Sequence, residues 1–160
     1  MARIVVLLFI LIATGAASGQ TPTLCPWASV GTAERLLGGE VSLSAHVEAN
    51  GTGSCSFTRK DGDGASAIEI LVSGTDTRPC PQDSVKLKAL GNEAVQCRLS
   101  TSASQKSDRI AGRIRRVFFV VTLTNIPGAT NPEPSDPRLA DAYAASPLER
   151  LAEQVVGNLY

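Results

Sequence analysis

The sequence predicts an α+β fold, in which an antiparallel sheet of about five strands carries a short N-terminal helix and a C-terminal amphipathic helix packed on it. Three observations support this prediction. Several segments alternate apolar and polar residues, short polar turns separate them, and the C-terminal segment has an apolar stripe at helical spacing. The chain has 160 residues, 43% of them hydrophobic, which is enough for one domain with a sizeable core.

Residues 1–19 have the layout of a secretory signal peptide. Arg3 provides a basic start, and Ile4 to Ala13 form an unbroken apolar run. Small residues follow, which suit cleavage after Ala17 or Gly19. We therefore expect a secreted or periplasmic protein.

The remaining chain, residues 20–160, is expected to be one disulfide-stapled domain without a membrane anchor. The apolar run of the signal peptide is shorter than the roughly 20 residues that a bilayer-spanning helix needs. The residues before Cys25 do not form the small-residue box that precedes a lipid-modified cysteine.

All four cysteines follow the signal peptide, so we expect them to be oxidised in pairs. Four cysteines allow three connectivities. We favour Cys25–Cys55 and Cys80–Cys97, because the sequential pattern closes the shortest loops. Each bond is then expected to add about 3 to 4 kcal/mol to stability. A reactive thiol is not expected, because no cysteine stands beside a histidine or in a redox pair.

The first part of the domain predicts a helix followed by an antiparallel meander. Thr32 can cap a helix over residues 33–37, which Gly38 and Gly39 would end. Alternation with a period of two then predicts strands at residues 41–47, 54–59 and 67–73. Turn residues separate these strands at 50–51 and 61–64.

The next part predicts a loop and two further strands. Residues 74–83 contain Pro79, Cys80 and Pro81 and are expected to form a loop pinned by one disulfide. A fourth strand is predicted at 94–100, and the polar residues 101–109 are expected to form a flexible turn or hairpin tip. The most hydrophobic run after the signal peptide lies within 114–124 and predicts the central strand.

The C-terminal part predicts an irregular connection followed by two helices. Prolines between residues 127 and 137 prevent continuation of the sheet. Asp136 can cap a helix over 137–144. Ser146 and Glu149 form a capping box for the last helix. The apolar stripe of that helix is expected to pack on the sheet and contains Leu148, Leu151, Ala152, Val155, Val156 and Leu159.

Four segments together resemble a family of small exported domains of unknown function found in actinobacterial and related lipoproteins. They are a cysteine shortly before Thr-Ala-Glu-Arg-Leu-Leu-Gly, a Cys-Ser-Phe strand, Ala-Leu-Gly-Asn-Glu-Ala at 89–94, and a closing Leu-Ala-Glu-Gln-Val-Val-Gly-Asn-Leu helix. The resemblance covers most of residues 25–160. It implies an extracytoplasmic α+β domain with a Cys25–Cys55 bond and no catalytic residue. The chain departs from the pattern in lacking the lipid-anchor cysteine.

Composition argues against several classes of function. The chain has 15 basic and 15 acidic residues, so its net charge offers little attraction to nucleic acid. The single histidine, His46, is expected to be an exposed strand residue rather than a catalytic base or metal ligand. We therefore expect no enzyme activity, no catalytic residue, no metal and no cofactor.

The remaining hypothesis is a non-catalytic binding or accessory domain. A cluster of arginines contains Arg113 and Arg115, which alternation would place on one face of a strand, where they could bind an anionic envelope component or a secreted protein. The alternatives are a secreted enzyme inhibitor that uses the loop at 79–81, and an envelope-associated protein that uses the arginine cluster.

Overall fold

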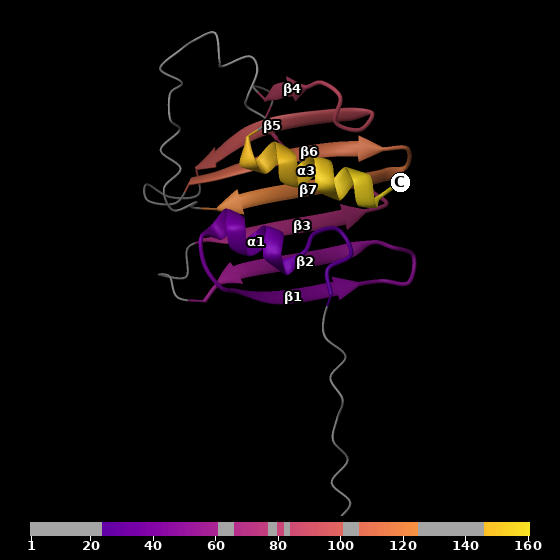
Figure 1. The fold of residues 1–160 in the computed structure, drawn as a ribbon. Helices are drawn as coiled ribbons and strands as arrows, with labels where there is room; N and C mark the ends of the chain where they lie inside the picture. The colour runs from indigo at the N-terminus through magenta and orange to yellow at the C-terminus, as the bar shows by residue number, and fades with distance from the viewer. Residues whose placement is uncertain (1–23, 61–65, 77–79, 82–83, 101–105, 125–145) are drawn as a thin grey trace, which may run out of the picture.

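The computed structural model describes residues 24–60, 66–76, 80–81, 84–100, 106–124 and 146–160. These residues form a seven-stranded antiparallel sheet and two helices, which both lie against one face of the sheet (Figure 1). The predicted signal peptide, the turn at 61–64, the proline-rich connection and the helix over 137–144 lie outside the described residues. Within the described residues, no helix is long and apolar enough to cross a bilayer.

The sheet has the strand order β1-β2-β3-β7-β6-β5-β4, and every neighbouring pair is antiparallel. The strands are β1 (Val41–Val47), β2 (Gly53–Arg59), β3 (Ala67–Ser73), β4 (Val85–Leu87), β5 (Glu93–Ser100), β6 (Lys106–Ile114) and β7 (Val117–Thr124). The meander of the first three strands is as predicted. The hydrophobic strand β7 is central, as its composition predicts.

The prediction of about five strands is wrong, because two further strands exist. Strand β4 is three residues long and too short to show a period of two. Strand β6 begins at Lys106, within the stretch that was expected to be a hairpin tip. The predicted central strand at 114–124 also includes a turn at Arg115 and Arg116, which separates β6 from β7.

Helix α1 (Val30–Leu37) starts earlier than expected, because Ser29 and not Thr32 is its N-cap. The Ser29 side chain accepts a hydrogen bond from the backbone N–H of Thr32. The helix ends at Gly38, whose left-handed backbone (φ 72°) suits glycine. Its buried residues Ala33 and Leu37 face the sheet core.

Helix α3 (Pro147–Asn158) begins at the predicted capping box. The backbone N–H of Ser146 donates to Glu149 Oε2 at 2.6 Å, and the backbone N–H of Glu149 donates to Ser146 Oγ at 3.2 Å. The apolar stripe of the helix is buried in one cluster with the inner side chains of the sheet. Its members are Leu148, Leu151, Ala152, Val155 and Val156.

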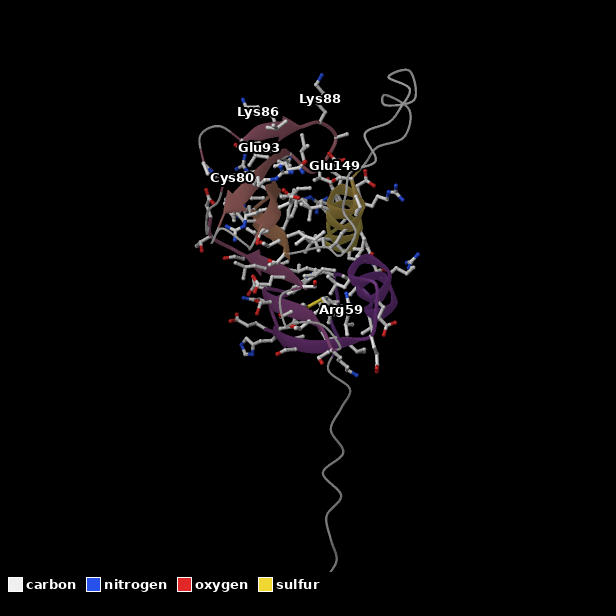
Figure 2. All side chains as sticks on the ribbon, turned by 90° about the vertical axis from the view of Figure 1, so that its left-hand side faces the viewer. Arg59, Cys80, Lys86, Lys88, Glu93 and Glu149 are labelled. Atoms are coloured by element: carbon white, nitrogen blue, oxygen red, sulfur yellow. A yellow bond between two sulfur atoms is a disulfide. The ribbon has the colours of Figure 1, made fainter. Side chains whose placement is uncertain are left out.

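Two disulfides join the pairs favoured above, Cys25–Cys55 and Cys80–Cys97. The first attaches the segment before α1 to the inner face of β2, where Cys55 is fully buried. The second attaches the loop after β3 to strand β5, on the opposite face of the sheet (Figure 2). Each bond therefore fastens an irregular segment to one face of the sheet.

Candidate functional site

The candidate site lies on the face of the sheet that α1 and α3 leave uncovered, which we call the open face. In Figure 2 the helices lie on one side of the sheet and Cys80 on the other. Because side chains alternate along a strand, the residues between the buried ones form this face. It includes Ser44, His46, Ser54, Ser56, Glu69, Leu71, Glu93, Val95, Arg109, Ala111, Arg113, Phe118, Val120 and Thr122.

A first hollow of about 330 Å³ lies over strands β1, β2, β3, β7 and β6. Most of its lining residues are polar, because β1 and β2 carry serines at their outward positions. Successive strand partners place Glu69, Thr122 and Arg109 in one row across the sheet. The Arg109 Nε donates a hydrogen bond to Thr122 Oγ1 at 3.1 Å, which orients the guanidinium. The hollow thus presents hydroxyls, a carboxylate and a guanidinium.

A second hollow of about 160 Å³ lies beside the first, and Val120 lines both. Its floor is apolar and contains Val95, Ala111 and Phe118. Arg113 and Glu93, opposite each other on β6 and β5, form an ion pair at its edge, with Arg113 Nη2 3.0 Å from Glu93 Oε1. The hollow therefore combines an apolar surface with a fixed pair of opposite charges.

Arg113 has a buried hydrogen-bond donor without an acceptor. Its Nε has almost no contact with solvent and no hydrogen-bond partner within the described part of the chain. A buried donor without a partner costs about 1 to 3 kcal/mol, and such groups in a native structure call for an explanation. Since solvent does not reach this atom, a bound molecule contacts the Arg113 guanidinium through its other N–H groups, or contacts Nε after the side chain turns.

Arg113 and Arg115 do not share a strand face, so the expectation that alternation places them together is wrong. Arg113 is on β6 and its side chain is part of the open face. Arg115 lies in the turn between β6 and β7 and has a positive φ of 55°. The guanidinium of Arg115 lies 5.6 Å from the centre of the Tyr160 ring, at the end of the chain after α3. The turn interrupts the alternation that would have kept the two side chains together.

Metal-ligating side chains do not cluster in the part of the chain that the structure describes. His46 is exposed on β1, where serines and Glu69 share the first hollow with it. No group of three or more histidine, cysteine, aspartate or glutamate residues is close enough to hold a metal, as far as the described residues go. What the open face provides is a set of hydrogen-bonding groups beside apolar patches, which suits binding.

Several residues of the open face were not predicted as site residues, among them Glu69, Arg109, Phe118 and Thr122. Alternation along β3 places Glu69 between buried neighbours, and this signal could have identified it. Strand β7 shows no such alternation, and Arg109 lies on β6. What alternation could not show is that β3, β7 and β6 are neighbours in the sheet.

No protein-family model, no curated protein and no solved structure matches this chain.

Proposed function

We propose that this chain is an exported, non-catalytic binding domain that holds a hydroxyl-rich chain, such as an oligosaccharide of the cell envelope, across the open face of its sheet. The observation that carries the proposal is the Arg113 guanidinium, which lies at the edge of the apolar second hollow and whose Nε has no acceptor among the described residues. A sugar hydroxyl or ring oxygen can accept a hydrogen bond from this group.

The chemistry of both hollows supports a ligand that donates and accepts hydrogen bonds. Glu69, Glu93 and Asp76 supply acceptors, while Arg109 and Arg113 supply donors, so the charges of the face differ by one and nearly balance. A balanced face favours a polar ligand over a strongly anionic one. The apolar surface of Phe118 and its neighbours suits the C–H face of a sugar ring.

The size of the hollows supports an extended ligand. Since a water molecule takes up about 30 Å³ of liquid, the second hollow, at 160 Å³, has room for one small group such as a single sugar ring. The first hollow is about twice as large and adjoins it at Val120. A short chain of sugar units would therefore run across the strands rather than along them.

The test is a titration of the disulfide-bonded protein with soluble neutral and uronic-acid oligosaccharides, followed by amide chemical shifts. We expect shifts on β5, β6 and β7 and loss of affinity in Arg113→Gln by about tenfold or more, since hydrogen bonds to charged groups are among the stronger ones. Arg35→Gln on α1 is the matched control, because Arg35 is exposed on the other face of the sheet. It should bind as the unmodified protein does.

Shifts confined to α1 and α3, or equal affinities for Arg113→Gln and the unmodified protein, would contradict the proposal. Absence of any shift with the whole panel at millimolar concentration would contradict the choice of oligosaccharide as ligand class. Retained binding after Arg113→Gln would show that the buried donor has no part in recognition.

Attachment to an anionic envelope surface through the arginine cluster has less support. Arg113 is paired with Glu93, and Arg115 lies over Tyr160 on the helix side. The inhibitor hypothesis depends on the loop at 79–81, of which Pro79 lies outside the described residues. Inhibition of a protease from a representative panel, abolished by substitutions in that loop, would favour it over the oligosaccharide proposal.

A further inference from the structure

Strand β1 forms one edge of the sheet and has backbone groups available for another strand. The backbone N–H of Lys60 donates to the carbonyl of Glu40, and that of Glu48 donates to the carbonyl of Thr52. In an antiparallel ladder, alternate residues bond to the neighbouring strand. The even-numbered residues of β1 therefore face β2, and Val41, Leu43, Ala45 and Val47 direct their N–H and C=O groups outward. Among the described residues, no backbone group bonds to them.

This edge lacks the features that usually prevent strands from pairing. Natural edge strands are protected by charged residues, prolines, bulges or short length. Strand β1 is seven residues long and has no lysine, arginine, acidic residue or proline. The opposite edge, β4, is three residues long and includes Lys86. The two edges are therefore unequal, and β1 is the one suited to pairing.

Exposed apolar side chains gather beside the same edge. Leu24 is 73% exposed, Val47 40% and Val30 38%. They line a groove of about 820 Å³ on the helix side of β1, together with Leu43 and Pro26. A strand added to β1 would lie next to this groove and cover part of its apolar surface, which favours association.

We propose that the occupant of this edge is a second copy of the same chain, paired β1 to β1 in antiparallel orientation about a two-fold axis at Leu43. The sheets of the two copies would then become one continuous sheet with all helices on the same face. In this register Val41 lies opposite Ala45 of the second copy, and Glu40 lies opposite its His46.

Charge disfavours the neighbouring register on one side. Shifting the partner by two residues one way places Glu40 opposite Glu48 of the second copy, and like charges directly opposite are destabilising. A further shift of two residues in the same direction would place Val41 opposite the turn that follows β1 rather than opposite a strand residue. The chosen register instead gives two contacts between Glu40 and His46, at non-hydrogen-bonded positions where side chains are closest. Glu40 also keeps its ion pair with Lys60, which lies on its own chain.

The experiment is sedimentation equilibrium of the disulfide-bonded protein up to millimolar concentration. We expect a monomer–dimer equilibrium, and Ala45→Pro is expected to abolish it, because proline removes an outward N–H without touching the ladder to β2. Ala45→Thr keeps that N–H and is the matched control. Circular dichroism shows whether the Ala45→Pro protein retains the fold.

Exposed His46 provides a second test that does not depend on tolerance of proline. His46→Glu places a second carboxylate opposite Glu40 at two positions across the two-fold axis and should weaken the dimer about tenfold. His46→Lys places a positive charge there and should tighten the dimer. Thr58→Glu makes a similar change of charge one strand further in, opposite Ser42 rather than His46, and should leave the dimer unchanged. A monomer throughout the concentration range, or a dimer insensitive to both Ala45→Pro and His46→Glu, would overturn the proposal. Ala45 lines neither hollow, so the result for Ala45→Pro does not depend on whether the open face binds an oligosaccharide.

Discussion

Gly112 on β6 lies directly opposite Phe119 on β7, and the aromatic ring covers the space where a Cβ would be. A Cβ built on Gly112 would lie 2.7 Å from Phe119 Cζ and 2.7 Å from the backbone carbonyl oxygen of Glu93. Phe119 is fully buried beneath the helices. The absence of a side chain at Gly112 thus allows the inward-facing phenylalanine of the central strand to pack in the core.

We expect Gly112→Ala to reduce the free energy of unfolding by about 1 to 3 kcal/mol, the usual cost of overpacking a core. One of the two close contacts is with backbone, which cannot rotate away. Urea denaturation measures the loss. Gly31→Ala in α1 is the control, because its Cβ would meet nothing within 4 Å. A Gly112→Ala protein as stable as the unmodified one would show that the ring moves freely.

Ala89 and Gly38 both have a left-handed backbone, and exchanging alanine and glycine there should change the free energy of unfolding in opposite directions. Ala89 is exposed and has a φ of 65°, a conformation that costs a residue with a side chain. We expect Ala89→Gly to raise the unfolding free energy by about 0.5 kcal/mol and Gly38→Ala to lower it by about 1 kcal/mol. Thermal unfolding of both variants checks this, and a change of the same sign in both would contradict it.

The capping box of α3 is expected to contribute to global stability, because α3 covers the centre of the sheet. Ser146→Ala removes the side-chain acceptor for the Glu149 N–H and should cost about 1 kcal/mol. Ser42→Ala, at an exposed position of β1, should change stability by less than about 0.5 kcal/mol. Chemical denaturation measures the stability of both variants. Equal losses of stability would show that the capping box does not contribute to global stability.

Removing the two disulfides should have different local effects. The double substitution Cys25→Ala with Cys55→Ala is expected to lower the free energy of unfolding by about 3 to 4 kcal/mol, because the bond closes a loop between cysteines that are 30 residues apart. It should also shift the emission of Trp27 to longer wavelength, because buried Trp27 lies two residues from Cys25. Emission that moves equally when Cys80 and Cys97 are replaced would contradict this local effect.

Asn158 connects the two ends of the described chain, and the sequence contains no sign of this contact. Its Nδ2 donates to the backbone carbonyl oxygen of Trp27 at 3.1 Å. Asn158 lies at the end of α3 and Trp27 precedes α1, so the bond depends on both helices packing on the same face (Figure 1). Such a contact arises only after the sheet has brought distant segments together.

Local patterns were sufficient where each element carried its own signal. Ser146 and Glu149 marked the start of α3, and period-two alternation marked the meander, because these patterns depend on residues close in sequence. They were insufficient for β6, where outward polar residues such as Ser107 and Arg109 and the small pair Ala111–Gly112 leave little apolar alternation. Strand β6 forms because β5 and β7 supply its hydrogen bonds on both sides.

The amino-acid sequence by itself determined the α+β class, the meander and the amphipathic last helix, since each follows from spacing along the chain, and it favoured the two disulfide pairs over the other connectivities. Only the tertiary structure decided the strand order, the sheet face left open by the helices, the separation of Arg113 from Arg115, and the exposed edge at β1. Those features depend on which strands become neighbours. Neighbours are chosen by the burial of apolar side chains from the whole domain at once, and no short segment contains that information.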